Sequence, residues 1–75
     1  MPKPVSLPKY KLGVAIRKYR KRNELTQKML SEKLGMHHAT LSLIERGERN
    51  ISFLMAVYII KKLNFSKNEI ESIFK

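Results

Sequence analysis

Apolar residues recur three and four positions apart in the first part of the chain, and cations fill most of the positions between them. The apolar residues of this series are Leu12, Ala15, Ile16 and Tyr19. Because an α-helix turns once about every 3.6 residues, this spacing places them on one helical face. It predicts an amphipathic helix from about Tyr10 to the pair Asn23–Glu24, with its apolar face turned to a core.

A second helix is predicted between a capping threonine and a glycine. The Thr26 side chain can accept a hydrogen bond from the first turn, and Gly35 tolerates the left-handed backbone that ends many helices. Between them, Leu30 and Leu34 lie four positions apart and share a face. Met29 stands where a capping box would have an acid, so no reciprocal cap is expected here.

Three more helices are expected, and no segment alternates in the way that strands do. One covers about residues 38–46 and buries Leu41 and Ile44, and one covers about residues 52–63. The last begins at Ser66, which forms the S-x-x-E pattern of a capping box with Glu69. It is expected to bury Ile70, Ile73 and Phe74. We therefore predict an all-α fold, a compact five-helix bundle that forms a single domain over residues 10–75.

The segment 53–60 is apolar all round, so a helix there must be buried on more than one side. The residues expected to serve the domain core are Phe53, Ala56, Val57, Ile60 and Leu63. A second face carries Leu54, Met55 and Tyr58, although a chain of 75 residues offers little core to fill. We expect this face to form a homodimer interface, together with Ile73 and Phe74 of the last helix.

The charge of the chain indicates a polyanionic partner. Sixteen Lys and Arg against six Asp and Glu give a formal net charge of +10, and residues 1–22 hold eight cations and no acid. A field of this sign favours nucleic acid or an anionic membrane surface. The membrane is disfavoured, because the basic and apolar residues do not form one long amphipathic helix.

Residues 1–9 are basic, contain Pro2, Pro4 and Pro8, and are predicted to form an extended arm. The arm either enters the minor groove of DNA or is disordered, and its composition favours disorder. No segment has the features of a signal peptide or of a membrane span. The expected location is therefore the cytoplasm, at the nucleoid.

The sequence offers little for catalysis or metal binding. It has no cysteine, and its two histidines, the adjacent His37 and His38, lack a third ligand for a metal site. These rings are expected to contact DNA or solvent instead. Paired carboxylates, a nucleophile with its base and a phosphate loop are all missing, so we expect neither an enzyme nor a cofactor or small-molecule ligand.

The segment from Gln27 to Ile44 has the spacing of two helices that cross steeply over a short turn. Such helices need a small residue where their backbones approach, here Ser31, and a positive φ at the corner, here Gly35. Apolar residues of both helices then point into a shared core. This leaves the outer face of the second of them free to enter the major groove of DNA.

Three runs, Ile16–Arg20, Leu25–Gln27 and Ser42–Gly47, resemble the Cro/C1-type helix-turn-helix family of phage and bacterial regulators. The resemblance covers roughly residues 10–65, and the run Glu45–Ser52 also resembles the controller proteins of restriction–modification systems. It implies a fold of the λ-repressor type, in which the second and third helices form the helix-turn-helix. It further implies a role in transcription regulation.

The resemblance also implies roles for single residues. Gln27 is implied to grip a phosphate at the start of the second helix, and Arg20 to pair with Glu45. The implied base contacts are His38, Ala39, Ser42 and Leu43. The implied phosphate contacts are Arg17, Arg20, Thr26, Gln27, Thr40, Arg46, Arg49 and Asn50. Thr40 is equally placed to pack against the second helix.

Ala39 and Leu43 offer only apolar contact, for example to a thymine methyl group. Direct readout is therefore expected to be modest, with DNA shape supplying part of the specificity. The expected function is that of a homodimeric repressor or autoregulator that binds a palindromic operator in double-stranded DNA. The alternative is a protein-interaction module, such as an antitoxin or an anti-repressor partner, whose apolar fourth and fifth helices bind another protein.

Overall fold

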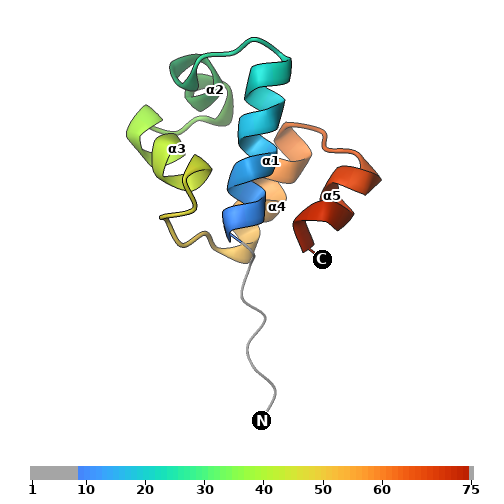
Figure 1. The fold of residues 1–75 in the computed structure, drawn as a ribbon. Helices are drawn as coiled ribbons and strands as arrows, with labels where there is room; N and C mark the ends of the chain where they lie inside the picture. The colour runs from blue at the N-terminus through green and yellow to red at the C-terminus, as the bar shows by residue number, and fades with distance from the viewer. Residues whose placement is uncertain (1–8, 75) are drawn as a thin grey trace.

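The computed structural model describes residues 9–74, and its regular elements are five α-helices (Figure 1). They are α1 (Lys9–Arg22), α2 (Gln27–Leu34), α3 (His38–Glu45), α4 (Phe53–Lys62) and α5 (Lys67–Phe74). The all-α five-helix fold is confirmed, with helix bounds close to those expected. The predicted arm lies outside the described residues, except that Lys9 already belongs to α1.

Helix α1 lies in the middle of the molecule, with α2 and α3 on one side, α5 on the other and α4 behind it (Figure 1). Each helix contributes to one core. Its buried residues are Leu12, Ile16, Leu30, Leu34, Leu41, Ile44, Ala56, Ile59, Leu63, Phe65 and Ile73. The inward faces predicted for α1, α2 and α3 are therefore confirmed, and apolar burial of this kind is the main source of stability in a domain so small.

The inward face of α4 differs from the one expected. Ile59 is fully buried, although it was not among the predicted core residues, whereas Phe53 is 64% exposed. The prediction of a buried Phe53 is wrong. Phe53 lies three positions before the buried Ala56, but it forms the first turn of α4 at the lower end of the molecule (Figure 1). At that end the helix extends past the core.

The turn between α2 and α3 has the geometry that the sequence predicts. Gly35 adopts a left-handed backbone with φ 67°, and its N–H donates to the Glu32 carbonyl oxygen at 3.1 Å. The Met36 N–H donates to the Ser31 carbonyl oxygen at 2.9 Å, which completes the cap. Ser31 itself is only 3% exposed, as expected for the small residue at a helix crossing.

A close approach between α1 and α3 depends on Gly13, which the sequence pattern did not single out. A Cβ atom at this position would collide with the Ile44 carbonyl oxygen and lie 2.8 Å from the Glu45 carbonyl oxygen. These are backbone atoms at the end of α3, so they have little room to move. Glycine at position 13 therefore sets the distance between α1 and the end of α3.

Helix α5 begins with the predicted capping box. The Ser66 N–H donates to the Glu69 carboxylate at 3.1 Å, and the Glu69 N–H donates to the Ser66 hydroxyl oxygen at 3.2 Å. Donation from the Ser66 backbone lowers the pKa of the Glu69 carboxyl; burial opposes this, and the Ser66 hydroxyl and the Arg22 guanidinium lower the pKa further. Since Arg22 lies 3.3 Å from that carboxylate, the box also fastens α5 to the end of α1.

Candidate nucleic-acid interface

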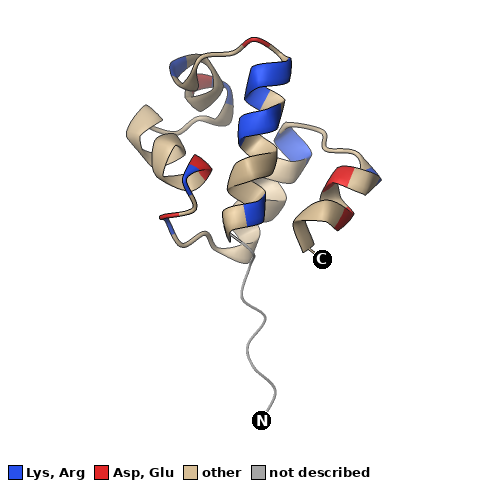
Figure 2. Ribbon diagram, in the orientation of Figure 1, with Lys and Arg blue, Asp and Glu red and all other residues tan. Residues whose placement is uncertain are grey.

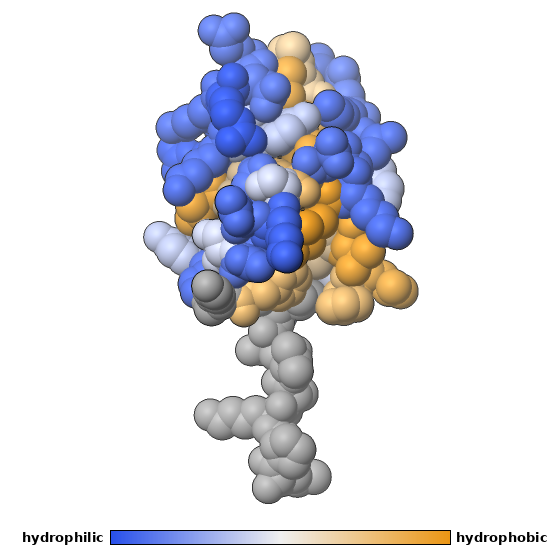
Figure 3. Space-filling model, turned by 90° about the vertical axis from the view of Figure 1, so that its right-hand side faces the viewer, coloured by the Kyte–Doolittle hydropathy of each residue, from blue (hydrophilic) through white to orange (hydrophobic). Residues whose placement is uncertain are grey.

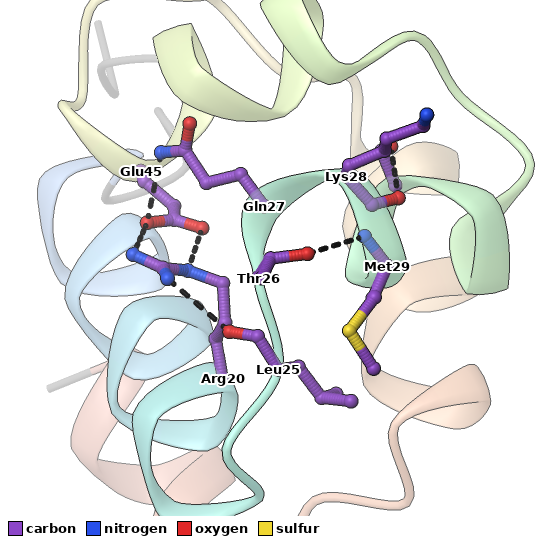
Figure 4. A network of polar contacts seen from close by, with 8 residues as sticks. Arg20, Leu25, Thr26, Gln27, Lys28, Met29 and Glu45 are labelled. Atoms are coloured by element: carbon purple, nitrogen blue, oxygen red, sulfur yellow. Dashed lines mark hydrogen bonds and ion pairs between the residues drawn. The ribbon is translucent and has the colours of Figure 1, made fainter.

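A buried ion pair joins the first three helices. Arg20 donates through Nε to Glu45 Oε2 at 2.9 Å and through Nη2 to Glu45 Oε1 at 3.1 Å (Figure 4). The Glu45 side chain is 3% exposed and that of Arg20 is 17% exposed. Arg20 also donates through Nη1 to the Leu25 carbonyl oxygen at 3.3 Å. The pairing implied by the resemblance is confirmed, and it holds the end of α3 against α1 and the start of α2.

The start of α2 is built from two side chains with different tasks. Thr26 caps the helix, since its hydroxyl oxygen accepts the Met29 N–H at 3.0 Å (Figure 4). Gln27 is half-buried and donates through Nε2 to Glu45 Oε1 at 3.4 Å. Gln27 therefore extends the Arg20–Glu45 pair to the first residue of α2, a contact that sequence reasoning did not foresee.

Helix α3 turns one face inward and one outward. Leu41 and Ile44 are buried, His38 and Ala39 are exposed, and the other members of the outward face are half-buried. Those half-buried residues are Thr40, Ser42 and Leu43. His38 and Ser42 lie four positions apart, as do Ala39 and Leu43, so the four predicted base-contacting residues share one strip of the helix.

His37 has a structural role that sequence reasoning missed. It is the N-cap of α3, and its Nδ1 accepts the Ala39 N–H at 3.1 Å. Its ring also stacks on that of His38, with 4.5 Å between the ring centroids and 28° between the planes. Histidine is not among the preferred capping residues, so the only signal was its place directly before the helix.

Basic residues lie on two sides of the helix-turn-helix formed by α2 and α3. Figure 2 shows Lys and Arg gathered along α1 and at the end of α3, while α5 carries acidic residues. Arg17 is exposed on α1, and Arg46, Arg49 and Asn50 are exposed after α3. Arg46 also forms an exposed ion pair with Glu48, with 3.2 Å between Nε and Oε2.

Apolar side chains are exposed on a different part of the molecule. Leu54 is 80% exposed, Met55 40%, Tyr58 43% and Phe74 42%. Figure 3 shows apolar surface toward the lower end of the face that it views, among basic side chains. Tyr58 donates its hydroxyl hydrogen to the Leu34 carbonyl oxygen at 2.9 Å, and beside it a groove of about 430 Å³ runs between α4 and the turn after α2.

One residue of the predicted dimer interface is not on this surface. Ile73 is 1% exposed and belongs to the core cluster. The prediction that Ile73 belongs to the dimer interface is wrong, because its side chain faces the core of the domain. Phe74, the next residue, is turned outward. The alternation follows from the helical period, since neighbouring residues point about 100° apart.

The described residues contain no cluster of three or more His, Cys, Asp or Glu side chains that is arranged to hold a metal ion. His37 and His38 face each other as a stacked pair instead. Among the helices of residues 9–74, none is long and apolar enough to cross a membrane.

Comparison with known proteins places this arrangement in a family. The family model described as helix-turn-helix matches residues 16–70. The control protein C.SmaI of Serratia marcescens is 37% identical over 55 residues. That match covers 73% of this chain and 66% of C.SmaI, just under two thirds of its length.

Solved structures show the same fold over nearly the whole chain. The restriction–modification controller protein C.Esp1396I, as a tetramer in complex with its natural 35-base-pair operator, has a TM-score of 0.72 at 29% identity. The comparison covers 95% of this chain and 100% of that one. The clp gene regulator ClgR of C. glutamicum has a TM-score of 0.71 at 26% identity and covers 99% of this chain and 97% of its own.

The Cro/C1-type resemblance inferred from the sequence is thereby confirmed, as is its extension to controller proteins. The match to the family model covers the ion pair, both helices of the helix-turn-helix and the start of α5. The chain belongs to the helix-turn-helix family of the Cro/C1 type, a family of DNA-binding transcription regulators and not of enzymes.

Proposed function

We propose that this protein is a sequence-specific regulator of transcription that binds double-stranded DNA as a homodimer. Helix α3 enters the major groove, and two copies read the halves of a palindromic operator. The observation that carries the proposal is the outward strip of α3, held in place by the buried Arg20–Glu45–Gln27 contacts. A helix that reads base edges needs a fixed orientation, and these contacts supply it for α3.

Within the proposal, base edges are read by His38, Ala39, Ser42 and Leu43. The phosphate contacts on either side come from Arg17, Arg20, Thr26, Gln27, Thr40, Arg46, Arg49 and Asn50. Three of these also have tasks within the domain, since Arg20 and Gln27 bond to Glu45 and Thr26 caps α2. Arg17 and Arg46 are exposed cations, and Arg46 would have to leave its ion pair with Glu48 to reach a phosphate.

The dimer is proposed to form through Leu54, Met55, Tyr58 and Phe74. Leu54, Met55 and Tyr58 line one groove and Phe74 is exposed as well, and large exposed apolar residues on a small domain indicate a protein-binding surface. C.Esp1396I, which this chain resembles in fold, is a tetramer in complex with its operator, and this supports the proposal that the present chain also self-associates. We propose repression or autoregulation as the outcome, in the cytoplasm, where dimer concentration sets occupancy.

The test compares two pairs of variants on a duplex selected from a random pool. His38→Ala and Leu43→Ala are expected to change which sequence is preferred, because they alter base contacts. Gln27→Ala and Arg46→Ala are expected to weaken binding to all duplexes alike, because they alter phosphate contacts. Equal effects of both pairs on sequence preference would contradict the proposed roles.

A further inference from the structure

His37 links the backbone of α3 to a side chain that the proposed function assigns to base reading. Its backbone is extended, with φ −70° and ψ 143°, and its Nδ1 accepts the Ala39 N–H at 3.1 Å. An imidazole nitrogen accepts a hydrogen bond only through a free lone pair. The neutral ring therefore carries its hydrogen on Nε2, and the capping bond fixes how the ring lies over the first turn of α3.

The ring fixed in this way covers one face of the His38 ring. The centroids are 4.5 Å apart and the planes differ by 28°, which is stacking geometry. Both histidines are exposed, and an exposed side chain otherwise changes rotamer freely within nanoseconds. A cap alone would be provided at least as well by Asn, Asp or Ser. The imidazole adds to the cap a flat surface that restrains its neighbour.

We infer that His37 is a positioning residue that determines base preference through His38 without having to contact a base itself. The inference rests on the proposed function. His38 is the first residue of α3, and in this class of protein the first residues of the reading helix face the base edges. Because hydrogen bonds weaken steeply with misalignment, a ring held in one orientation discriminates between bases better than a rotating one.

The direct test is His37→Asn, measured on the duplex selected by the wild type and on duplexes changed at each base pair. Asparagine keeps a capping oxygen but removes the ring. We expect binding to an unrelated duplex to stay as in the wild type, while discrimination falls about fivefold to tenfold at the base pair that His38 reads. Because both residues act through one ring, combining His37→Asn with His38→Ala should cost no more discrimination than His38→Ala alone.

The matched control is Ser66→Ala, which removes the side-chain cap of α5, a helix outside the helix-turn-helix. The Ser66 hydroxyl oxygen accepts the Glu69 N–H at 3.2 Å, so its loss mimics the loss of a cap without touching His38. We expect Ser66→Ala to lower thermal stability and to leave base preference unchanged. A loss of preference from this variant would overturn the inference, because a general loss of stability would then explain the effect.

Two further results would overturn it. One is a His37→Asn protein that discriminates between base pairs as well as the wild type does. The other is a double variant in which the loss of discrimination from His37→Asn adds to the loss from His38→Ala. A wild type without any sequence preference would overturn the proposed function as well, which separates the two failures.

In the free wild type, NMR should show ring-to-ring nuclear Overhauser contacts and hydrogen on Nε2 of His37. Rings that turn independently of each other would also overturn the inference.

Discussion

Glu45 accepts hydrogen bonds from both Arg20 and Gln27, although its side chain is 3% exposed. Burying a carboxylate is costly unless it is paired and hydrogen-bonded, and this one is both. The pair joins residues from α1, α2 and α3. At the scale of single residues, it is the contact that ties the orientation of the proposed reading helix to the rest of the domain.

Replacing Glu45 should therefore destabilise the fold strongly. Glu45→Ala leaves Arg20 without its carboxylate in a mostly buried place and is expected to cost about 3 kcal/mol of unfolding free energy. The matched control is Glu48→Ala, which breaks the exposed pair with Arg46 and is expected to cost less than about 1 kcal/mol. Urea unfolding of the three proteins gives both values, and equal costs would contradict the structural role of the buried pair.

Glu69 makes the stability depend on pH. Its pKa is lowered in the folded protein, chiefly by the Ser66 backbone N–H, so it stabilises the fold at pH values above the usual range of a glutamate. That contribution is lost as the pH falls through the lowered pKa. We expect Glu69→Gln to be less stable than the wild type at neutral pH and nearly equal to it near pH 2, as followed by thermal unfolding. Glu71→Gln, at an exposed position of the same helix, is the control, and a difference for Glu69→Gln that stays constant with pH would contradict this origin.

At the scale of elements, the contact between α1 and α3 should respond to Gly13. Glycine to alanine within a helix normally stabilises it by about 0.5–1 kcal/mol. Here the added Cβ would collide with the end of α3, so we expect Gly13→Ala to destabilise the fold by about 1–3 kcal/mol. Lys18→Ala, exposed on the same helix, is the control. A stabilised Gly13→Ala protein in urea unfolding would show that the helices are not so close.

Most of the elements could be predicted because their signals are local. Apolar spacing gives the inward faces of α1 to α3, and Thr26, Gly35 and Ser66 mark helix ends by their own side chain or backbone. Apart from the misplaced Ile73, whose burial follows from the period of α5 itself, the misses concern relations between elements. The exposure of Phe53 depends on where the core ends, and the need for Gly13 depends on the backbone of α3. Neither can be read from a window of neighbouring residues.

The candidate site likewise contains some features that the sequence predicted and others that it did not. The Arg20–Glu45 pair and the strip from His38 to Leu43 were expected from the resemblance, and the pair is present. The cap formed by His37 was not expected, because histidine rarely caps helices. Nor was the hydroxyl bond from Tyr58 to Leu34, since it joins residues 24 positions apart.

At the scale of the whole molecule, the exposed apolar surface makes a prediction about assembly. We expect the wild type to sediment as a dimer at tens of micromolar and Leu54→Glu as a monomer, since a charge in the centre of an apolar interface opposes burial. Leu54 is 80% exposed, so the variant should fold normally. Tyr10→Glu, at a residue 71% exposed on α1, is the control and should remain dimeric. A monomeric wild type would indicate that this surface binds a different protein.

The central claim is that the chain reads DNA sequence as a symmetric pair, and selection of duplexes from a random pool at near-physiological salt tests it most directly. We predict a two-fold symmetric consensus with half-sites about one helical turn apart, because two recognition helices of a dimer meet successive major grooves on one side of the DNA. Recovery of no consensus, with binding that disappears as salt rises, would contradict the claim. It would leave only the attraction of a +10 protein for a polyanion.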